Sequence, residues 1–383
     1  MEMKELVHRV KDIAEQSSRK ETPGTPVYVG LARPWFADRF GVDLVQYFTD
    51  AELCLRTQLM AKIFKHDHVP DDNVIKPVVG LDFATTLEAS LFGVEPIYRP
   101  GQEPCFGAPV IKEKSDLDRL ELPDFYRSGI MPQVHRMYAR MQELVDGELE
   151  ISFPGWARGP WSVACMLRGF TEIYIDLMED PDFVHRLMQF LVKAKLHYER
   201  ERAKFLGVDM KEQPTWKYIY MDYREVGPSD LYNDEVDGAL FSVDTYREFI
   251  FPYEEQLAKS YGGCRYYHSC GKMDTLLPQV GQLPGLKIVH VSAWTDVVKA
   301  RAAVPEGTTL QVVMHVQDDV MDATEPHMRE RLMKVVDACR GVPFIICADT
   351  INNGPIEKVQ EWLAIAREVL DQAELPDIRA ARF

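Results

Sequence analysis

The feature of the sequence that most constrains its fold is an alternation of short β-type runs with helical stretches, which extends over most of the 383 residues. The later helical stretches are clearly marked, and residues 325–340 place Met328, Leu332, Val335 and Val336 on one face. Strands that alternate with helices are typical of a parallel α/β sheet, and eight such units close into a barrel. The predicted strands are residues 26–31, 74–79, 150–153, 218–221, 264–268, 286–291, 310–314 and 344–346.

We therefore predict an α/β protein with a single (β/α)8 TIM barrel and long early loops. The expected divisions are an N-terminal helical extension over residues 1–24, the barrel over 25–372, and a C-terminal tail over 373–383. Residues 80–130 contain several Pro and Gly turns and are interpreted as insertions on the barrel. An open doubly wound sheet is the competing architecture. The sequence disfavours it because no glycine-rich phosphate loop opens a helix.

Composition narrows the class of protein. The formal net charge of −16 argues against nucleic acid or an anionic membrane as a partner. The longest apolar runs are much shorter than a membrane span, and the first five residues do not resemble a signal sequence. Seven cysteines without a secretory signal indicate reduced thiols. We expect a cytoplasmic protein in which clustered cysteines bind metal or act in catalysis.

The strongest chemical signal is the run Tyr266–Gly271, which reads YYHSCG. Side chains alternate faces along a strand, so His268 and Cys270 point the same way at its carboxyl end. In a barrel this end is the mouth of the active site. Cys347 ends another β-type run, and strands five and eight would direct all three residues into one mouth. We predict that His268, Cys270 and Cys347 are catalytic residues and metal ligands.

One imidazole and two thiolates form a three-ligand zinc set with an open fourth position, as catalytic zinc sites require. The alternative is a packed His268 with cysteines that behave as small buried apolar residues. From the pattern alone the two interpretations have similar weight.

The His-x-Cys motif followed by a distant Cys resembles the zinc methyltransferases of the uroporphyrinogen decarboxylase-like superfamily. The similar branch contains methylcobalamin:coenzyme M methyltransferases and chloromethane-utilisation methyltransferases. The resemblance covers roughly residues 25–372, with supporting stretches at 155–170, 178–182 and 249–253. It implies a (β/α)8 barrel and a zinc ion held by His268, Cys270 and Cys347. It also implies an enzyme that transfers a methyl group between a corrinoid and a small thiol or methyl-ether substrate.

Two loops depart from the pattern of thiol-alkylating relatives, which have an acidic stretch after the sixth strand. Here only Asp296 could take that role, and the loop after the seventh strand carries His315 instead of the usual Gly-Asn-Val-Asp-Pro. Decarboxylases of the superfamily have an arginine-rich N-terminal segment that binds substrate carboxylates. Arg33 and Arg39 lie in the corresponding stretch, but the pattern differs.

Other residues are candidates for substrate binding at the mouth. Asp222 follows the fourth predicted strand, and Trp35 and Trp294 could line a pocket for an aromatic or corrin ring. For each, a structural role is at least as common. His290 is expected to pack within its strand. The proposed substrate-binding residues are Arg33, Trp35, Asp222, Trp294, Asp296 and His315.

The leading interpretation is a corrinoid-linked zinc methyltransferase. None of the ten histidines lies in the Asp-x-His-x-x-Gly pattern of a cobalamin module, so the corrinoid is expected on a separate small protein or as free methylcobalamin. One alternative is a metal-independent decarboxylase of an aromatic or porphyrin-like acid. Another is a non-catalytic barrel that binds a corrinoid or tetrapyrrole. Zinc content distinguishes the first alternative from the leading interpretation, and turnover distinguishes the second.

Overall fold

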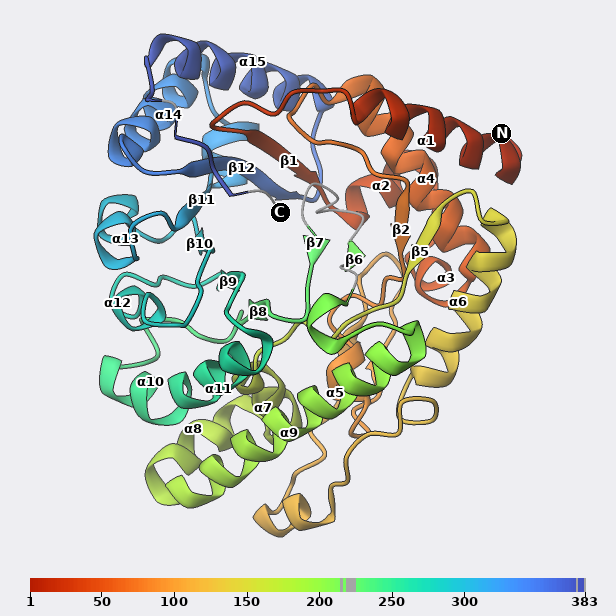
Figure 1. Ribbon diagram of the computed structural model, residues 1–383, viewed down its shortest axis with the longest axis vertical. Helices are drawn as coiled ribbons and strands as arrows, with labels where there is room; N and C mark the ends of the chain where they lie inside the picture. The colour runs from red at the N-terminus through yellow and green to blue at the C-terminus, as the bar shows by residue number, and fades with distance from the viewer. Residues whose placement is uncertain (214–215, 218–224, 377, 382–383) are drawn as a thin grey trace.

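The computed structural model describes residues 1–213, 216–217, 225–376 and 378–381. A ring of parallel strands is surrounded by helices, as predicted for an α/β barrel (Figure 1). The strands are β1 (Val27–Leu31), β2 (Val78–Gly80), β3 (Pro96–Ile97), β4 (Cys105–Phe106), β5 (Glu150–Ser152), β6 (Trp216–Lys217), β7 (Glu225–Val226), β8 (Leu231–Tyr232), β9 (Tyr266–His268), β10 (Ile288–Val291), β11 (Thr309–Val313) and β12 (Phe344–Ile351).

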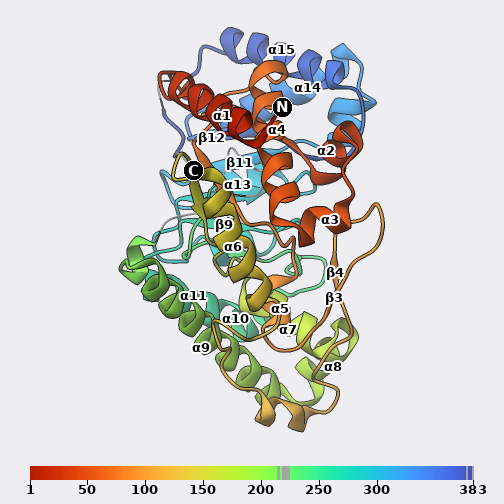
Figure 2. The ribbon, with the colours of Figure 1, turned by 90° about the vertical axis from the view of Figure 1, so that its right-hand side faces the viewer.

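The helices lie outside the ring and cover the outward faces of the strands (Figures 1 and 2). They are α1 (Met3–Ser17), α2 (Arg33–Phe40), α3 (Leu44–Thr49), α4 (Ala51–His68), α5 (Leu87–Ser90), α6 (Met131–Val145), α7 (Pro160–Arg168), α8 (Phe170–Glu179), α9 (Pro181–Leu206), α10 (Val243–Phe249), α11 (Phe251–Tyr261), α12 (Leu277–Val280), α13 (Val297–Ala303), α14 (Glu325–Cys339) and α15 (Ile356–Gln372). Three short helical segments complete the set, namely η1 (Lys114–Arg119), η2 (Met210–Glu212) and the π-helical turn η3 (Val316–Met321).

Parallel pairing orders the largest sheet as β1-β12-β11-β10-β9-β8, and a second parallel pair joins β2 to β5. A single bridge between Arg158 and Tyr232 links the β5 side to β8. Strands β9 to β12 are buried on both faces, which is typical of a parallel sheet covered by helices. The predicted (β/α)8 fold is confirmed, with a hydrogen-bond ladder that is interrupted in the early strands.

The early part of the barrel differs most from the prediction. The proposed fourth strand, residues 218–221, lies outside the described residues. The strand beside β9 is β8, which has two residues and is followed by the polar run Asn233–Glu235. A run this short has no alternation of apolar and polar residues, so periodicity does not indicate it. β3 and β4 form an antiparallel hairpin within the insertion predicted for residues 80–130.

The ends of the chain pack against the barrel. Helix α1 lies along α4 and α6, and it buries Leu6, Val7 and Val10. At the other end, the amide of Ala381 donates to the Thr309 hydroxyl at the amino end of β11. The opposite ends of the strands stay open to a cavity. No helix in the described part of the chain has the length and apolar character of a membrane span.

Candidate active site

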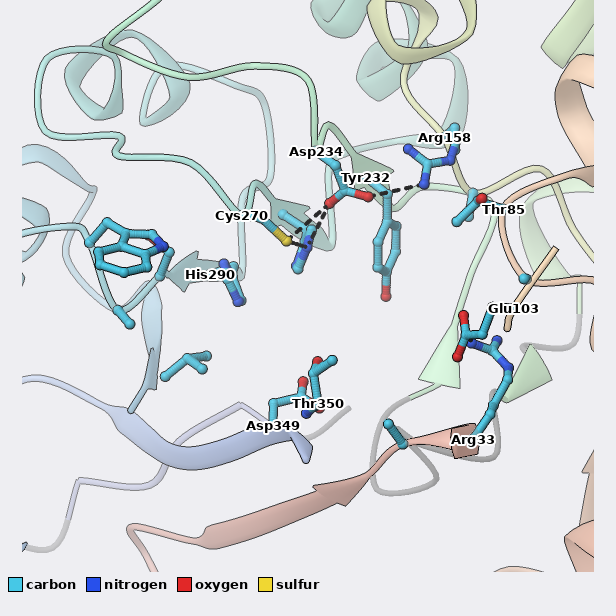
Figure 3. A pocket seen from close by; sticks show the side chains of 18 of the residues that line it. Arg33, Thr85, Glu103, Arg158, Tyr232, Asp234, Cys270, His290, Asp349 and Thr350 are labelled. Carbon is cyan, nitrogen blue, oxygen red and sulfur yellow. Dashed lines mark hydrogen bonds and ion pairs between the residues drawn. The ribbon is translucent and has the colours of Figure 1, made fainter. Parts of the chain in front are cut away.

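A cavity of about 350 Å³ lies at the carboxyl ends of the barrel strands. Its wall includes residues at the carboxyl ends of β1, β2, β5, β8, β9, β10, β11 and β12 or in the loops that follow them. Figure 3 shows ten of the lining residues around the space. Glu103 reaches the same cavity from the loop between β3 and β4. Active sites of (β/α)8 barrels occupy this end because side chains from distant strands converge there.

Three potential metal ligands from two adjacent strands meet at one side of the cavity. His268 Nε2 lies 3.0 Å from Asp234 Oδ1 and 3.3 Å from Cys270 Sγ, and the Cys270 thiol donates to Asp234 Oδ1 at 3.3 Å. His268 is the last residue of β9, and Asp234 follows the paired strand β8. The turn after Cys270 requires Gly271, since a Cβ there would lie 2.5 Å from a carboxylate oxygen of Asp237.

Arg158 fixes the carboxylate of Asp234 from the opposite side. Its guanidinium donates to Asp234 Oδ2 at 3.0 Å and to both carboxylate oxygens of Glu235 at 3.2 Å. Burial raises the pKa of Asp234, but the charge of Arg158 and the contacts with His268 and Cys270 outweigh it and hold the pKa well below its usual range. Asp234 is therefore an anion whose Oδ1 atom faces His268 and Cys270.

Cys270 is exposed to the cavity, and its sulfur faces an anion. The protein around the sulfur and the charge on Asp234 raise the pKa of the Cys270 thiol above its usual value. Without a cation, the thiol is protonated near neutral pH. A divalent cation reverses this preference because it stabilises the thiolate.

Tyr266 sets the orientation of the His268 ring. The Tyr266 hydroxyl donates to Gln311 Oε1 at 2.7 Å, so its oxygen accepts from His268 Nδ1 at 3.1 Å. The neutral ring then keeps its lone pair on Nε2, the atom that faces Asp234 and Cys270. An outer partner of this kind is typical of histidines that bind metals.

Cys347 lies outside this cluster. Among the described residues, Asp234, His268 and Cys270 are the group whose ligand atoms come within 4.8 Å of one another. Cys347 is fully buried, and its sulfur accepts from Gln311 Nε2 at 3.4 Å. The strand β12 continues beyond Cys347, and its later residues Asp349 and Thr350 line the cavity instead. The strand predicted over residues 344–346 corresponds to β12, but β12 extends to Ile351.

Arg33 lines the cavity, but carboxylates already balance its charge. Its guanidinium donates to both oxygens of Asp82 at 2.6 Å and to Glu103 at 3.0 Å. The Tyr47 hydroxyl also donates to Asp82. Arg33 therefore anchors the loops after β1 and β2, and it does not present an unbalanced positive charge to an acidic substrate.

The remaining predicted residues divide between the rim of the cavity and the scaffold. Trp294 lines the cavity, is 61% exposed, and contacts the ring of His315 edge to face. His315 caps η3, and Asp296 caps α13, with neither lining this cavity. Trp35 is buried, and its indole NH donates to the carbonyl of Gly354. Asp222 lies outside the described residues.

Sequence reasoning missed three residues at the centre of the site. Asp234 follows the two-residue strand β8, which pairs with β9, and Arg158 meets Asp234 because a bridge joins Arg158 to Tyr232 of β8. His290 lines the cavity, with its ring centroid 4.1 Å from that of His268, whereas a packed role was expected. Its position at the end of a β-type run was the available signal. The run Asn233–Glu235 could have been identified as a polar segment beside a barrel strand.

A buried carboxyl group supports the segment that carries Asp234. Glu254 on α11 is fully buried and accepts from Asn233 Nδ2 at 2.8 Å and from the Tyr246 hydroxyl at 2.5 Å. The backbone amide of Asn233 donates to the carbonyl of His268. Burial raises the pKa of Glu254 to about 7, although these hydrogen bonds oppose the shift. Glu254 is therefore a buried titratable group behind the ends of β8 and β9, which carry the residues of the site.

The donor set can bind a metal ion. A carboxylate oxygen, an imidazole nitrogen and a thiolate sulfur are all ligands of zinc, and sulfur excludes magnesium and calcium as preferred ions. The tautomer of His268 and the anionic state of Asp234 both suit a cation. Three protein ligands beside an open cavity leave a position for a substrate, as in catalytic zinc sites.

Comparisons with known proteins agree with the fold. A solved methyltransferase from Methanosarcina mazei superposes with a TM-score of 0.64 at 16% sequence identity, covering 94% of this chain and 98% of that chain. At this identity, the likeness establishes the fold. No curated protein sequence matches significantly. Residues 11–205, about half of the chain, match the model of the uroporphyrinogen decarboxylase (URO-D) family. The chain therefore belongs to the uroporphyrinogen decarboxylase (URO-D) family.

Proposed function

We propose that the protein is a zinc-dependent methyltransferase that moves a methyl group between a corrinoid and a small thiol or methyl-ether substrate. The observation that carries the proposal is the cluster of Asp234, His268 and Cys270 at the wall of the barrel cavity. The family and the fold shared with a methyltransferase from Methanosarcina mazei support the same reaction class. The His-x-Cys motif supports the branch that uses zinc.

A bound zinc ion supplies Lewis acidity, which lowers the pKa of a thiol or polarises an ether oxygen. The protein's own residues prepare that chemistry. Tyr266 directs the lone pair of His268 toward the cluster, and Arg158 holds the carboxylate of Asp234 in place. These outer contacts fix the ligands before the substrate arrives, which reduces the reorganisation required during the reaction.

We assign the third ligand position to Asp234, whereas the family resemblance assigns it to Cys347. Asp234 Oδ1 is already within 3.3 Å of the other two ligand atoms. The sulfur of Cys347 contacts Gln311, whose carbonyl oxygen accepts from Tyr266. In this assignment Cys347 acts indirectly, by packing the residues that orient His268.

The corrinoid is proposed to arrive on a separate small protein or as free methylcobalamin. The cavity is too small for a corrin macrocycle, since about 350 Å³ suits a substrate of modest size. Trp294 lies exposed at the rim, where an incoming corrin ring would meet it. We further propose that the reaction takes place in the cytoplasm, where the seven cysteines stay reduced.

The test is a cobalt spectrum. The zinc-loaded protein is mixed with methylcobalamin or a methylated corrinoid protein and with a panel of thiols and aryl methyl ethers. We expect a change in cobalt methylation with at least one substrate, and a return to the background rate in the Cys270→Ser variant. The matched control is Cys105→Ser, because Cys105 is exposed but does not line the cavity.

Absence of any cobalt change across the panel, together with release of carbon dioxide from an aromatic or porphyrin-like acid, would contradict the proposal. That result would favour a decarboxylase. Binding of the corrinoid without turnover by any substrate would favour a non-catalytic carrier.

A further inference from the structure

The described wall of the cavity carries more negative than positive charge. Four carboxylates line it, contributed by Glu88, Glu103, Asp234 and Asp349, against the two guanidinium groups of Arg33 and Arg158. The carboxylates come from separate parts of the chain, with Glu88 on α5 and Asp349 on β12, and Figure 3 shows Glu103, Asp234 and Asp349 on different sides of the space. A wall of this kind creates a negative potential inside a cavity that is partly shielded from water.

Each of the two arginines is already engaged by two carboxylates. Arg33 pairs with Asp82 and Glu103, and the side chains of Arg33 and Asp82 are at most 5% exposed. Arg158 pairs with Asp234 and Glu235. One of these partners, Asp82, lies behind the wall and adds further negative charge near it. An anionic substrate would have to compete with these pairs, so the arginines do not make the cavity a site for acids.

Asp349 faces the metal-ligand cluster from across the cavity. Figure 3 shows Asp349 and Thr350 on the β12 side, with Asp234 and Cys270 on the other side. The Thr350 amide donates to Asp349 Oδ1 at 2.7 Å, while Thr350 adopts a φ of 63°. This left-handed conformation is unfavourable for a β-branched residue, and such strain is often retained at functional sites. A small substrate whose reacting end lies at the cluster of Asp234, His268 and Cys270 would place its other end near Asp349.

We propose that the cavity selects substrates whose non-reacting end is an amine or quaternary ammonium group and rejects carboxylates and sulfonates of the same size. The inference rests on the proposed function for the identity of the reacting end. Its charge argument rests on the wall, where a bound zinc ion would add two positive charges and a Cys270 thiolate one negative charge, so negative charge still exceeds positive charge. Tyr232 also lines the cavity, and an aromatic ring adds a favourable surface for an ammonium group.

The electrostatic potential of the cavity can be measured in the metal-free protein from the rates at which Cys270 reacts with charged reagents. Cys270 is labelled with the positively charged 2-aminoethyl methanethiosulfonate or with the negatively charged 2-sulfonatoethyl methanethiosulfonate. The Cys105→Ser background removes the other exposed thiol, since the remaining five cysteines are buried. Each rate is divided by that of free cysteine with the same reagent, so intrinsic reactivity cancels.

We expect the normalised rate of the cationic reagent to exceed that of the anionic reagent by at least about tenfold, and salt to reduce the ratio. The Asp349→Asn and Glu103→Gln variants should each lower the ratio several-fold. Asp371→Asn, an exposed surface carboxylate on α15, should leave it unchanged.

A ratio of one or below, or a ratio that both cavity variants leave unchanged, would overturn the inference. The labelling requires neither zinc nor corrinoid, so such a failure leaves the proposed methyltransferase reaction untouched. Conversely, a high ratio in a protein that transfers no methyl group would refute the proposed function while the preference for cations holds.

Discussion

The Asp234→Asn variant is expected to lose its bound zinc, whereas the Cys347→Ser variant retains it. The Asp234 carboxylate is anionic, and its Oδ1 atom lies 3.0 Å from the ligand nitrogen of His268. An amide in its place is neutral and a weaker donor. Because losing an outer partner of a metal ligand costs about 10- to 100-fold in affinity, losing a direct ligand should cost more than that. Competition with a chromophoric chelator measures the affinity of each variant.

Cys347→Ser provides the matched comparison, because it removes a thiol that the structure places outside the cluster. Circular dichroism spectra of both variants establish that the barrel remains folded. If Cys347→Ser loses the metal and Asp234→Asn keeps it, the assignment from the geometry is wrong and the ligand set implied by the family resemblance holds.

The second large effect concerns the buried carboxyl group of Glu254. Burial raises its pKa from 4.5 to about 7, so between these values the folded protein binds more protons than the unfolded chain. The stabilisation is fully present below pH 4.5 and is lost as the pH rises through the folded pKa near 7. A shift of this size corresponds to about 3 kcal/mol of unfolding free energy.

Glu254→Gln should remove that dependence, because a neutral amide reproduces the protonated acid toward the hydroxyl groups of Tyr246 and Tyr267. The unfolding free energy of the variant minus that of the unmodified protein is expected to rise by about 3 kcal/mol from pH 4.5 to a pH above 7. Urea unfolding across this range measures the difference. The neighbouring Glu255→Gln, a surface residue paired with Lys259, serves as the control. Parallel pH profiles for Glu254→Gln and the unmodified protein would show that Glu254 is ionised throughout.

The later barrel could be predicted because each of its units carries its own local signal. Strands β9 to β12 are runs of buried apolar or aromatic residues, and α14 and α15 have apolar residues at helical spacing. The early barrel carries weaker signals: the predicted runs 74–79 and 150–153 overlap β2 and β5, whereas β8 has two residues and was not predicted. Their place in the ring depends on pairing between segments far apart in the sequence, which periodicity does not reveal.

The candidate site could be predicted only in part from the sequence. His268 and Cys270 share one strand end, so alternation alone placed them together. Cys347 was expected at a strand end because its run seemed to stop there, but β12 continues to Ile351 and exposes Asp349 and Thr350 to the cavity. Asp234 and Arg158 come from different strands, and only the folded structure brings them together. The carboxylates that balance the charge of Arg33 are likewise distant in the sequence, so only the folded structure shows that they contact it.

The most direct test of the central claim is the metal content of the purified, reduced protein. Elemental analysis should find about one zinc per chain, since a carboxylate, an imidazole and a thiolate at mutual distances of 3.0–3.3 Å form a zinc site. The same measurement on Cys270→Ser should find almost none. Protein that takes up no zinc even when it is supplied, or a Cys270→Ser variant that retains its full complement, would contradict the account.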